Sequence, residues 1–266
     1  MSSLRNRVVW LTGASSGIGE ALTYELAKKG ARLIISARRK EELEKVKGNC
    51  ESAVQANIRI LPLDLTVTST LSLSVEAAVQ TFGHIDILIN NGGISQRSFA
   101  KDTSLEVDRR IMEVNYFGAI ALTKFLLPHF LKQKGGHFVV VSSLTGKFGT
   151  PYRSGYAASK HALHGFYDSL RAELWKENIK VTMIAPGFIH TPITLSALTG
   201  DGSPLNKMDE AQYRGKPVKW CARKIVKAIE KRKDEVYIGG REVLGVYVKR
   251  FFPRWFNRII RTAKVR

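Results

Sequence analysis

The fold is decided near the start of the 266-residue chain by residues 8–19, which read VVWLTGASSGIG. The first four residues form an apolar run of strand length, and Leu22 and Leu26 beyond the stretch have helical spacing. Between these segments lie Gly13, Gly17 and Gly19. A strand, a glycine-rich turn and a helix in this order let backbone N–H groups approach a pyrophosphate closely. The glycine spacing departs from Gly-x-Gly-x-x-Gly, so a tight turn without a ligand remains an alternative.

A second strand is expected at residues 32–37. A basic run, Arg38-Arg39-Lys40, follows it, and no acidic residue comes before Glu41. In dinucleotide-binding folds the end of this strand meets the adenosine ribose. An acidic side chain there accepts from a free 2′-hydroxyl, whereas a basic one pairs with a 2′-phosphate. Arg38 therefore favours NADP(H) over NAD. The alternative is that the basic run merely begins a solvated helix.

Strand-like and helix-like segments alternate along the rest of the chain. Strands are expected at 58–64, 85–90, 138–142, 181–185 and 236–238, and helices at 68–82, at 105–132, around Tyr156 to about 177, and at 218–231. No repeat, low-complexity segment or linker interrupts the series, and 44% of the residues are hydrophobic. The alternation predicts one α/β domain over residues 1–266, with a parallel sheet covered by helices on both faces.

Residues 142–160, which read SSLTGKFGTPYRSGYAASK, are the candidate centre of the chemistry. Tyr156 and Lys160 are four residues apart, so on one helix their side chains share a face. A nearby ammonium is expected to lower the pKa of the phenol and make it a useful acid. Ser143, at the end of an apolar run, could hold a carbonyl oxygen. The pair alone is weak evidence, because Tyr24 and Lys28 have the same spacing.

A break in regular structure follows residue 186. Glycines and prolines recur there, and about thirty residues pass before the helix expected at 218. Long loops in compact domains are usually lids or binding loops, so residues 187–216 are expected to close over a substrate. Their apolar side chains, together with Phe148, suit a lipophilic carbonyl compound, although such residues also form ordinary loop cores. The residues expected at this apolar mouth are Phe148, Phe188, Ile189, Ile193 and Leu195.

The C-terminal tail, residues 244–266, combines aromatic and basic residues. Pro253 can occupy the first turn of a helix in which Trp255, Phe256, Ile259 and Ile260 cluster among arginines. A basic amphipathic helix with aromatics is a candidate for contact with an anionic membrane surface. The alternative is a terminal helix packed on the domain or on a second subunit.

Charge and composition exclude several classes. The net charge is +19, and residues 201–266 alone carry 18 Lys+Arg against 7 Asp+Glu. No recognition motif accompanies this charge, so no specific nucleic-acid partner is expected. The apolar runs are too short to span a membrane and residues 1–7 hold no signal-peptide core, which predicts a cytoplasmic protein. The six histidines and two cysteines show no metal-ligand spacing, so no metal is expected.

These motifs together resemble the short-chain dehydrogenase/reductase family over nearly the whole chain. The resemblance rests on residues 12–19, Asn90-Asn91-Gly92-Gly93, Asn115, Ser143, Tyr156, Lys160 and Pro186-Gly187 in order. Residues 146–162 and 171–174 are most similar to the dehydrogenase/reductase member-seven group, near the 11β-hydroxysteroid dehydrogenases. The family usually has alanine where this chain has Gly92. Many members of the group carry an N-terminal membrane anchor, but this chain starts almost at its first strand, so that location is not carried over.

The resemblance implies a Rossmann-type, doubly wound, seven-stranded parallel sheet in the order 3-2-1-4-5-6-7, and a homodimer or homotetramer. It implies that Ser143 orients a carbonyl, Tyr156 transfers a proton, Lys160 lowers the pKa of Tyr156 and binds the nicotinamide ribose, and Asn115 supports a proton relay. The cofactor contacts it implies are Gly13, Ser15, Ser16, Gly17, Ile18, Gly19, Arg38, Asp64, Leu65, Asn91, Gly92, Gly93, Tyr156, Lys160, Pro186, Gly187, Ile189 and Thr191.

The function expected from these residues is NADPH-dependent, reversible reduction of a ketone or aldehyde, with Tyr156 protonating the carbonyl oxygen. Two alternatives stay open. An NAD-dependent alcohol dehydrogenase is disfavoured by Arg38. A non-catalytic nucleotide-sensing or membrane-adaptor protein on the same fold is disfavoured because such a protein has no evident need for Ser143, Tyr156 and Lys160 together.

Overall fold

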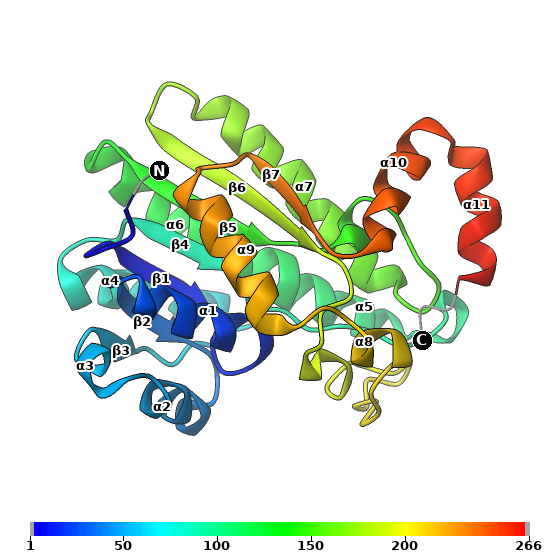
Figure 1. Ribbon diagram of the computed structural model, residues 1–266, viewed down its shortest axis with the longest axis horizontal. Coiled ribbons are helices and arrows are strands. Elements are labelled where there is room, and N and C mark those ends of the chain that lie inside the picture. The colour runs from blue at the N-terminus through cyan, green and yellow to red at the C-terminus, as the bar shows by residue number, and fades with distance from the viewer. Residues whose placement is uncertain (1–2, 264–266) are drawn as a thin grey trace.

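One seven-stranded parallel sheet forms the centre of the molecule in the computed structural model, which describes residues 3–263 (Figure 1). The strand order is β3-β2-β1-β4-β5-β6-β7, so the expected topology is confirmed. The strands are β1 Val8–Thr12, β2 Arg32–Ser36, β3 Ile58–Ile60, β4 Ile87–Asn90, β5 Gly136–Val141, β6 Ile179–Pro186 and β7 Glu235–Ile238.

Helices cover both faces of this sheet (Figure 1). On β1, Val9 and Leu11 join the core on the face of α1 and α9, whereas Val8 and Trp10 join the core on the opposite face, with α4, α6 and α7. Alternation with a period of two, apolar on both sides, is what a strand buried on both faces requires. The helices are α1 Gly17–Lys28, α2 Lys40–Gly48, α3 Ser52–Gln55, α4 Thr68–Phe82, α5 Leu105–Met112, α6 Gly118–Lys132, α7 Ser154–Glu173, α8 Glu210–Tyr213, α9 Val218–Glu230, α10 Leu244–Phe251 and α11 Pro253–Thr262.

Two expected elements differ from the structure. Strand β3 ends at Ile60 rather than at residue 64. The backbone N–H groups of Leu61 and Leu63 still donate to β2 and to Ala37, but Pro62 between them has no N–H to donate. The stretch 105–132 is helical throughout, as expected, but it is not a continuous α-helix, because the π-helical turn Glu113–Phe117 lies between α5 and α6. Within residues 3–263 no helix is both long and apolar enough to cross a membrane.

The C-terminal helices α10 and α11 lie against one another at the carboxyl edge of the sheet (Figure 1). Phe256 of α11 is buried with Phe148, Leu144 and Ala185 in a small apolar cluster. The alternative, a terminal helix packed on the domain, is confirmed for that side of α11. Another side of α11 faces solvent, since Trp255 is 58% exposed.

Candidate active site

A cavity of about 810 Å³ opens at the carboxyl ends of the strands, the edge at which ligands bind in open α/β sheets. Most of the residues expected at the site line this cavity, whereas Gly19 and Asn115 do not. The expected residues that line it are Gly13, Ser15, Ser16, Gly17, Ile18, Arg38, Asp64, Leu65, Asn91, Gly92, Gly93, Ser143, Tyr156, Lys160, Pro186, Gly187, Ile189 and Thr191.

The turn between β1 and α1 fits a dinucleotide pyrophosphate. Gly13 has a φ of +64°, and a Cβ on it would lie 2.7 Å from the Cα of Gly92. Ser16 stands at the N-cap of α1, and its side chain caps no N–H group of the helix. The positive end of α1 and its N–H donors therefore stay available to an anion in the cavity. Gly19 has a different role, because a Cβ there would overlap the Gly13 carbonyl oxygen. This glycine lets α1 approach the turn.

The loop after β4 is tied to this turn. The Thr12 hydroxyl oxygen accepts from the N–H groups of Asn91 and Gly92, each at 3.1 Å, and the Asn91 amide donates to the carbonyl oxygens of Thr12 and Gly13. A Cβ on Gly92 would lie 2.7 Å from a Leu65 methyl carbon. Gly92, where the family usually has alanine, thus leaves room for the Leu65 side chain at this point of the cavity wall.

The adenosine end of the cavity is basic. Arg38, Arg39 and Arg110 line it together with Asp64. Burial raises the pKa of Asp64, but hydrogen bonds from Thr66 and the charges of Arg38 and Arg110 outweigh it, so the pKa lies below its usual value. Sequence reasoning missed Arg110, which comes from α5, because nothing local in the sequence connects it to the end of β2.

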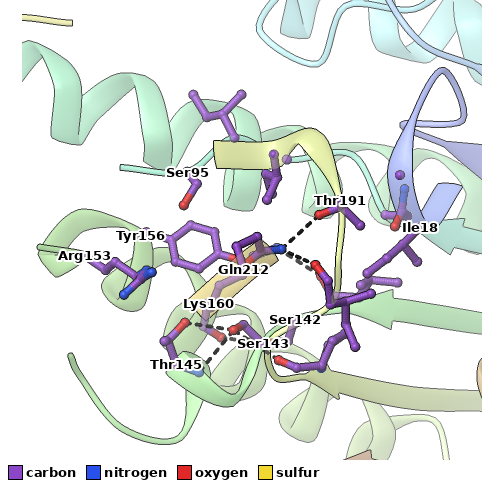
Figure 2. Close-up of a pocket in the computed structure, with 18 of the residues that line it drawn as sticks. Ile18, Ser95, Ser142, Ser143, Thr145, Arg153, Tyr156, Lys160, Thr191 and Gln212 are labelled. Carbon is purple, nitrogen blue, oxygen red and sulfur yellow. Dashed lines mark hydrogen bonds between the residues drawn. The ribbon is translucent and has the colours of Figure 1, made fainter. Parts of the chain in front are cut away.

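Ser143, Tyr156 and Lys160 meet at the other end of the cavity (Figure 2). The Ser143 hydroxyl oxygen accepts from the Thr145 hydroxyl at 3.0 Å. Lys160 Nζ lies 5.7 Å from the centroid of the Tyr156 ring and donates to the Val141 carbonyl oxygen at 3.0 Å. Lys160 is thereby held at the end of β5.

The electrostatics of Tyr156 differ from the expectation. Burial raises the pKa of the phenol, and this outweighs the lowering by the hydrogen bond with Ser143 and by the charges of Arg97 and Arg153. Burial also lowers the pKa of Lys160 to about 8, since a desolvated ammonium loses its proton more easily. The expected net lowering of the Tyr156 pKa is therefore not found, because desolvation of the phenol outweighs the groups that lower its pKa.

Tyr24, the other tyrosine with a lysine four residues later, lies outside the cavity. Its hydroxyl donates to Glu20 at 2.8 Å within α1. Burial and the neighbouring Glu20 raise its pKa to about 12. The structure therefore separates the two Tyr-x-x-x-Lys pairs as the sequence context indicated.

Asn115 sits behind the cavity wall. Its amide nitrogen donates to the Ile94 carbonyl oxygen at 3.0 Å and to the Ser159 hydroxyl at 2.9 Å, and its Oδ1 accepts from the Ile94 N–H at 2.8 Å. A Cβ on Gly93 would lie 3.0 Å from Oδ1 and 3.5 Å from Lys160 Nζ. The π-helical turn thus aims Asn115 at the loop after β4, where it fixes the position of that loop.

Other residues of the site gave no signal in the sequence. Arg97, Arg153 and Gln212 line the cavity beside Tyr156, and the Gln212 amide donates to the Thr191 hydroxyl at 3.0 Å (Figure 2). The tail also contributes to the wall. Its lining residues are Gly245, Val248, Phe256, Ile259, Ile260 and Ala263. Among residues 3–263, no three His, Cys, Asp or Glu side chains gather where they could hold a metal ion.

The chemistry available here is proton transfer beside a bound dinucleotide. A nicotinamide nucleotide supplies or accepts hydride when bound. The turn at Gly13 and Ser16 would hold its phosphates, Ser143 can donate to a carbonyl oxygen, and the buried Tyr156 can exchange a proton with that oxygen. The fold and the site together are those of a Rossmann-type oxidoreductase.

Comparison with known proteins agrees with this class. The family model described as short chain dehydrogenase matches residues 7–201. The chain is 47% identical over 240 residues to a dehydrogenase/reductase SDR family protein 7-like from Anopheles gambiae, which covers 88% of this chain and 75% of that protein. This chain belongs to the short-chain dehydrogenase/reductase family and is similar to its member-seven group.

Solved structures of this family share the fold. A short-chain dehydrogenase/reductase from Burkholderia phymatum in complex with NAD has a TM-score of 0.84 at 21% identity, covering 96% of each chain. A short-chain dehydrogenase from Burkholderia cenocepacia in complex with NADP has a TM-score of 0.79 at 24% identity, covering 99% of this chain and all of that one. The first of these neighbours holds NAD and the second holds NADP, and at these identities the likeness shows the fold that they share with this chain.

Proposed function

We propose that this protein is an NADP(H)-dependent oxidoreductase that reduces lipophilic ketones or aldehydes to alcohols, reversibly. The observation that carries the proposal is the joint placement of Ser143, Tyr156 and Lys160 at one end of a cavity whose other end holds arginines and the glycine-rich turn. In the proposed reaction the Ser143 hydroxyl orients the carbonyl oxygen and the Tyr156 hydroxyl protonates it. Lys160 faces the Tyr156 ring from the same side of α7.

The preference for NADP(H) rests on Arg38 and Arg39, which line the cavity where β2 ends, and on Arg110. A guanidinium can make charge-assisted, bidentate contacts with a 2′-phosphate, whereas a free 2′-hydroxyl gains nothing comparable from it. The solved neighbour that holds NADP agrees with the proposal. Because the other neighbour holds NAD, the experiment compares both nucleotides.

The substrate class rests on the walls beside Tyr156. Phe148, Phe188, Ile193 and Leu195 line the cavity as expected from the sequence. Phe256 and two isoleucines of α11 extend this apolar surface. A wall of this kind favours a steroid-like or acyl-chain carbonyl over a small polar one, since apolar contact area contributes about 25 cal/mol per Å².

The test is a carbonyl panel of graded size and apolarity, offered to the full chain with NADPH and with NADH. We expect oxidation of NADPH by the lipophilic carbonyls and a much smaller rate with the Tyr156→Phe variant. A clear preference for NADH would favour the NAD-dependent alternative. Nucleotide binding without turnover of any panel member above the Tyr156→Phe rate would favour the non-catalytic alternative.

The location proposed is cytoplasmic, with peripheral contact of the tail on an anionic membrane. Trp255 is 58% and Phe251 69% exposed, and basic side chains accompany them along α10 and α11. Co-sedimentation with vesicles containing phosphatidylserine tests the contact. We expect Trp255→Ala with Ile259→Ala to reduce it. Trp175→Ala, at a tryptophan that is 72% exposed and far from the tail in the sequence, should leave it unchanged. Equal binding by all three proteins would contradict the proposal.

The assembly proposed is a homodimer or homotetramer. Phe117, at the end of the π-helical turn, and Phe125, in α6, are 46% and 42% exposed. They lie eight residues apart, which places them on the same broad face of the helix. Burying such aromatic side chains against a second copy would remove apolar area from water. Light scattering of the wild type and of Phe125→Glu tests this: a monomeric wild type, or no change in mass on substitution, would count against it.

A further inference from the structure

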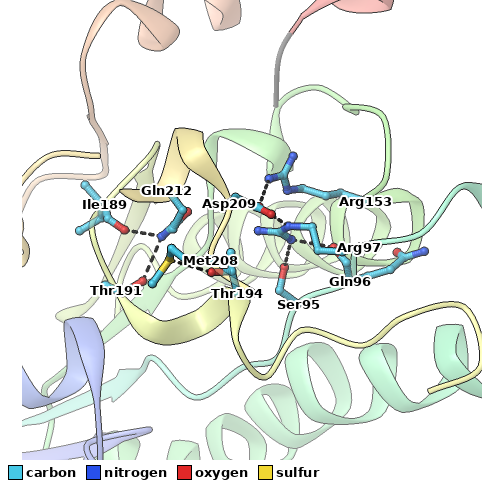
Figure 3. Close-up of polar contacts among 10 residues, drawn as sticks. All are labelled: Ser95, Gln96, Arg97, Arg153, Ile189, Thr191, Thr194, Met208, Asp209 and Gln212. Atoms are coloured by element: carbon cyan, nitrogen blue, oxygen red, sulfur yellow. Dashed lines mark hydrogen bonds and ion pairs between the residues drawn. The ribbon is translucent and has the colours of Figure 1, made fainter. Parts of the chain in front are cut away.

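The Gln212 side chain connects α8 to the segment that follows β6 (Figure 3). Its amide donates to the Ile189 carbonyl oxygen and, at 3.0 Å, to the Thr191 hydroxyl oxygen. Gln212 is 8% and Thr191 7% exposed, so both are shielded from bulk solvent, although both line the cavity. One amide thereby holds two positions of the loop that borders the site.

The two hydrogen bonds determine which way the Gln212 amide points. Only its NH₂ group can face the Ile189 carbonyl oxygen, because an amide oxygen in that place would put two acceptors against each other. The second hydrogen of the same NH₂ group then points to Thr191 Oγ1, which must accept it. The Thr191 hydroxyl has one hydrogen of its own, and among residues 3–263 no group accepts it. That hydrogen is therefore available to a ligand in the cavity.

Thr191 stands where the nicotinamide end of a dinucleotide would bind. A Cβ on Gly17 would lie 3.4 Å from the Cβ and the methyl carbon of Thr191, so Thr191 borders the turn that would hold the pyrophosphate. With its adenosine at Arg38 and its phosphates at this turn, a nucleotide would place its nicotinamide in the part of the cavity that Thr191 and Tyr156 line. A nicotinamide carries a carboxamide, whose oxygen is an acceptor for a hydroxyl hydrogen.

Buried contacts on both sides of α8 hold this segment in place. Oδ2 of Asp209, the residue before α8, accepts from Arg97 Nε at 2.5 Å and from Arg153 Nη2 at 3.1 Å (Figure 3). After α8, a Cβ on Gly215 would lie 2.8 Å from the carbonyl carbon and oxygen of Phe188, so the backbones of the two segments pack closely. The amide is therefore presented by a segment that is anchored at both ends.

We propose that Gln212 is a positioning residue: by donating to Thr191 Oγ1, it directs the Thr191 hydroxyl hydrogen to the carboxamide oxygen of the nicotinamide. The role rests on the nicotinamide nucleotide of the proposed function, and it gives the 187–216 segment a part in binding that cofactor. Without the amide the hydroxyl can rotate, so its hydrogen is no longer directed at the carboxamide. Contacts to the rest of the nucleotide stay as they are.

Binding of two nucleotides, one of which lacks the nicotinamide, tests the proposal. Isothermal titration calorimetry measures the Kd of the full chain for NADPH and for 2′-phospho-ADP-ribose. Gln212→Met keeps the length of the side chain and removes the amide, so the Kd for NADPH should rise about 3- to 10-fold, the equivalent of one net hydrogen bond. The Kd for 2′-phospho-ADP-ribose should stay within about twofold of the wild type, since that nucleotide has no carboxamide to bind.

Three further variants make the comparison specific. Thr191→Val removes the hydroxyl and keeps the shape of the side chain, so it should show the same selective loss. The double variant should bind NADPH no more weakly than Thr191→Val alone, because Gln212 acts through that hydroxyl. Gln133→Met is the matched control. The Gln133 amide donates to the Ile85 and Gly135 carbonyl oxygens at the opposite edge of the sheet, so its loss should leave both constants unchanged.

The pattern across the two nucleotides decides the outcome. A loss confined to NADPH, with no additional loss in the double variant, supports the proposal. An equal loss for both nucleotides, or unchanged binding of both, would reduce Gln212 to a structural support of the loop and overturn the proposal. Additive losses in the double variant would overturn it as well. If Gln212→Met does not fold, Gln212→Asn, whose amide is one methylene shorter, is judged in the same way.

The same titrations separate this inference from the proposed function. Turnover that fails while the selective loss is present would count against the proposed reaction alone. A wild type that prefers NADH is compared with NADH and ADP-ribose, and the same pattern decides. A wild type that binds neither NADPH nor NADH would overturn this inference together with the proposed function.

Discussion

The ring of Phe256 in α11 packs against the ring of Phe148, with their centroids 5.1 Å apart and their planes at 58°. Phe256 is 5% exposed, and both residues line the cavity. The C-terminal tail is therefore part of the site wall, and its contribution to substrate binding can be measured apart from its exposed side.

Replacement of Phe256 by alanine should widen the cavity and weaken its apolar wall. We expect the free energy of unfolding to fall by about 3 kcal/mol and the KM for a lipophilic carbonyl to rise about tenfold, with a smaller change in kcat. Steady-state kinetics and urea denaturation measure the two effects. Phe251→Ala is the matched control, because Phe251 lies in the same tail but is 69% exposed. Equal effects of the two substitutions would show that Phe256 has no particular place in the wall.

Replacement of Arg38 by alanine should weaken NADPH binding and leave NADH binding almost unchanged. A hydrogen bond to a charged group is worth about 1.5–3 kcal/mol, so the Kd for NADPH should rise about 10- to 100-fold. Fluorescence titration at one ionic strength measures both constants, since surface charge depends on salt. Arg223→Ala, far from the cavity, controls for the loss of one positive charge. An unchanged NADPH affinity in Arg38→Ala would remove the basis for the nucleotide preference.

Tyr156→Phe removes one hydroxyl and should lower turnover by roughly 10²–10⁴ while NADPH still binds. Lys160→Ala should weaken both turnover and cofactor binding. Tyr24→Phe should change neither, because the Tyr24 hydroxyl is bonded to Glu20 within α1, away from the cavity. Cofactor titration beside steady-state reduction of an accepted carbonyl compares the three variants. Near-normal turnover in Tyr156→Phe would contradict the mechanism.

His137 should make the protein less stable in mild acid. It is buried on β5 with Nε2 2.8 Å from the Thr182 hydroxyl oxygen. Burial, with the charges of Arg232 and Lys180, lowers its pKa to about 3. The unfolded chain binds the proton more readily, so stability present above pH ~6.5 is lost as pH falls toward 3, by about 2 kcal/mol between pH 7.5 and 5.

Urea denaturation at several pH values measures this loss. His137→Gln should reduce the loss of stability between pH 7.5 and 5, to which His164 also contributes because burial lowers its pKa to about 4. The exposed His161 on α7 provides the control substitution, His161→Gln, which should retain the wild-type slope. An unchanged slope in His137→Gln would mean that other groups cause the acid sensitivity.

The sequence alone determined the alternation of strands and helices, the glycine-rich turn and the Ser143–Tyr156–Lys160 set, whereas the order of the strands came from the family resemblance. These features are local or periodic: β1 alternates between two cores, Gly13 and Gly17 occupy positive φ, and a four-residue spacing places two side chains on one helical face. Even the boundaries of α4, Thr68–Phe82, follow from periodicity.

Only the tertiary structure decided what those residues face. Arg97, Arg153 and Asp209 are distant in sequence, and no local pattern predicts that one carboxylate holds both arginines. The direction of the Tyr156 pKa shift likewise depends on burial, which is the sum of contacts from many segments. Sequence periodicity shows which side of a helix or strand is apolar. Which segment covers that side, and which charged side chains that segment places there, is decided only when distant segments pack together.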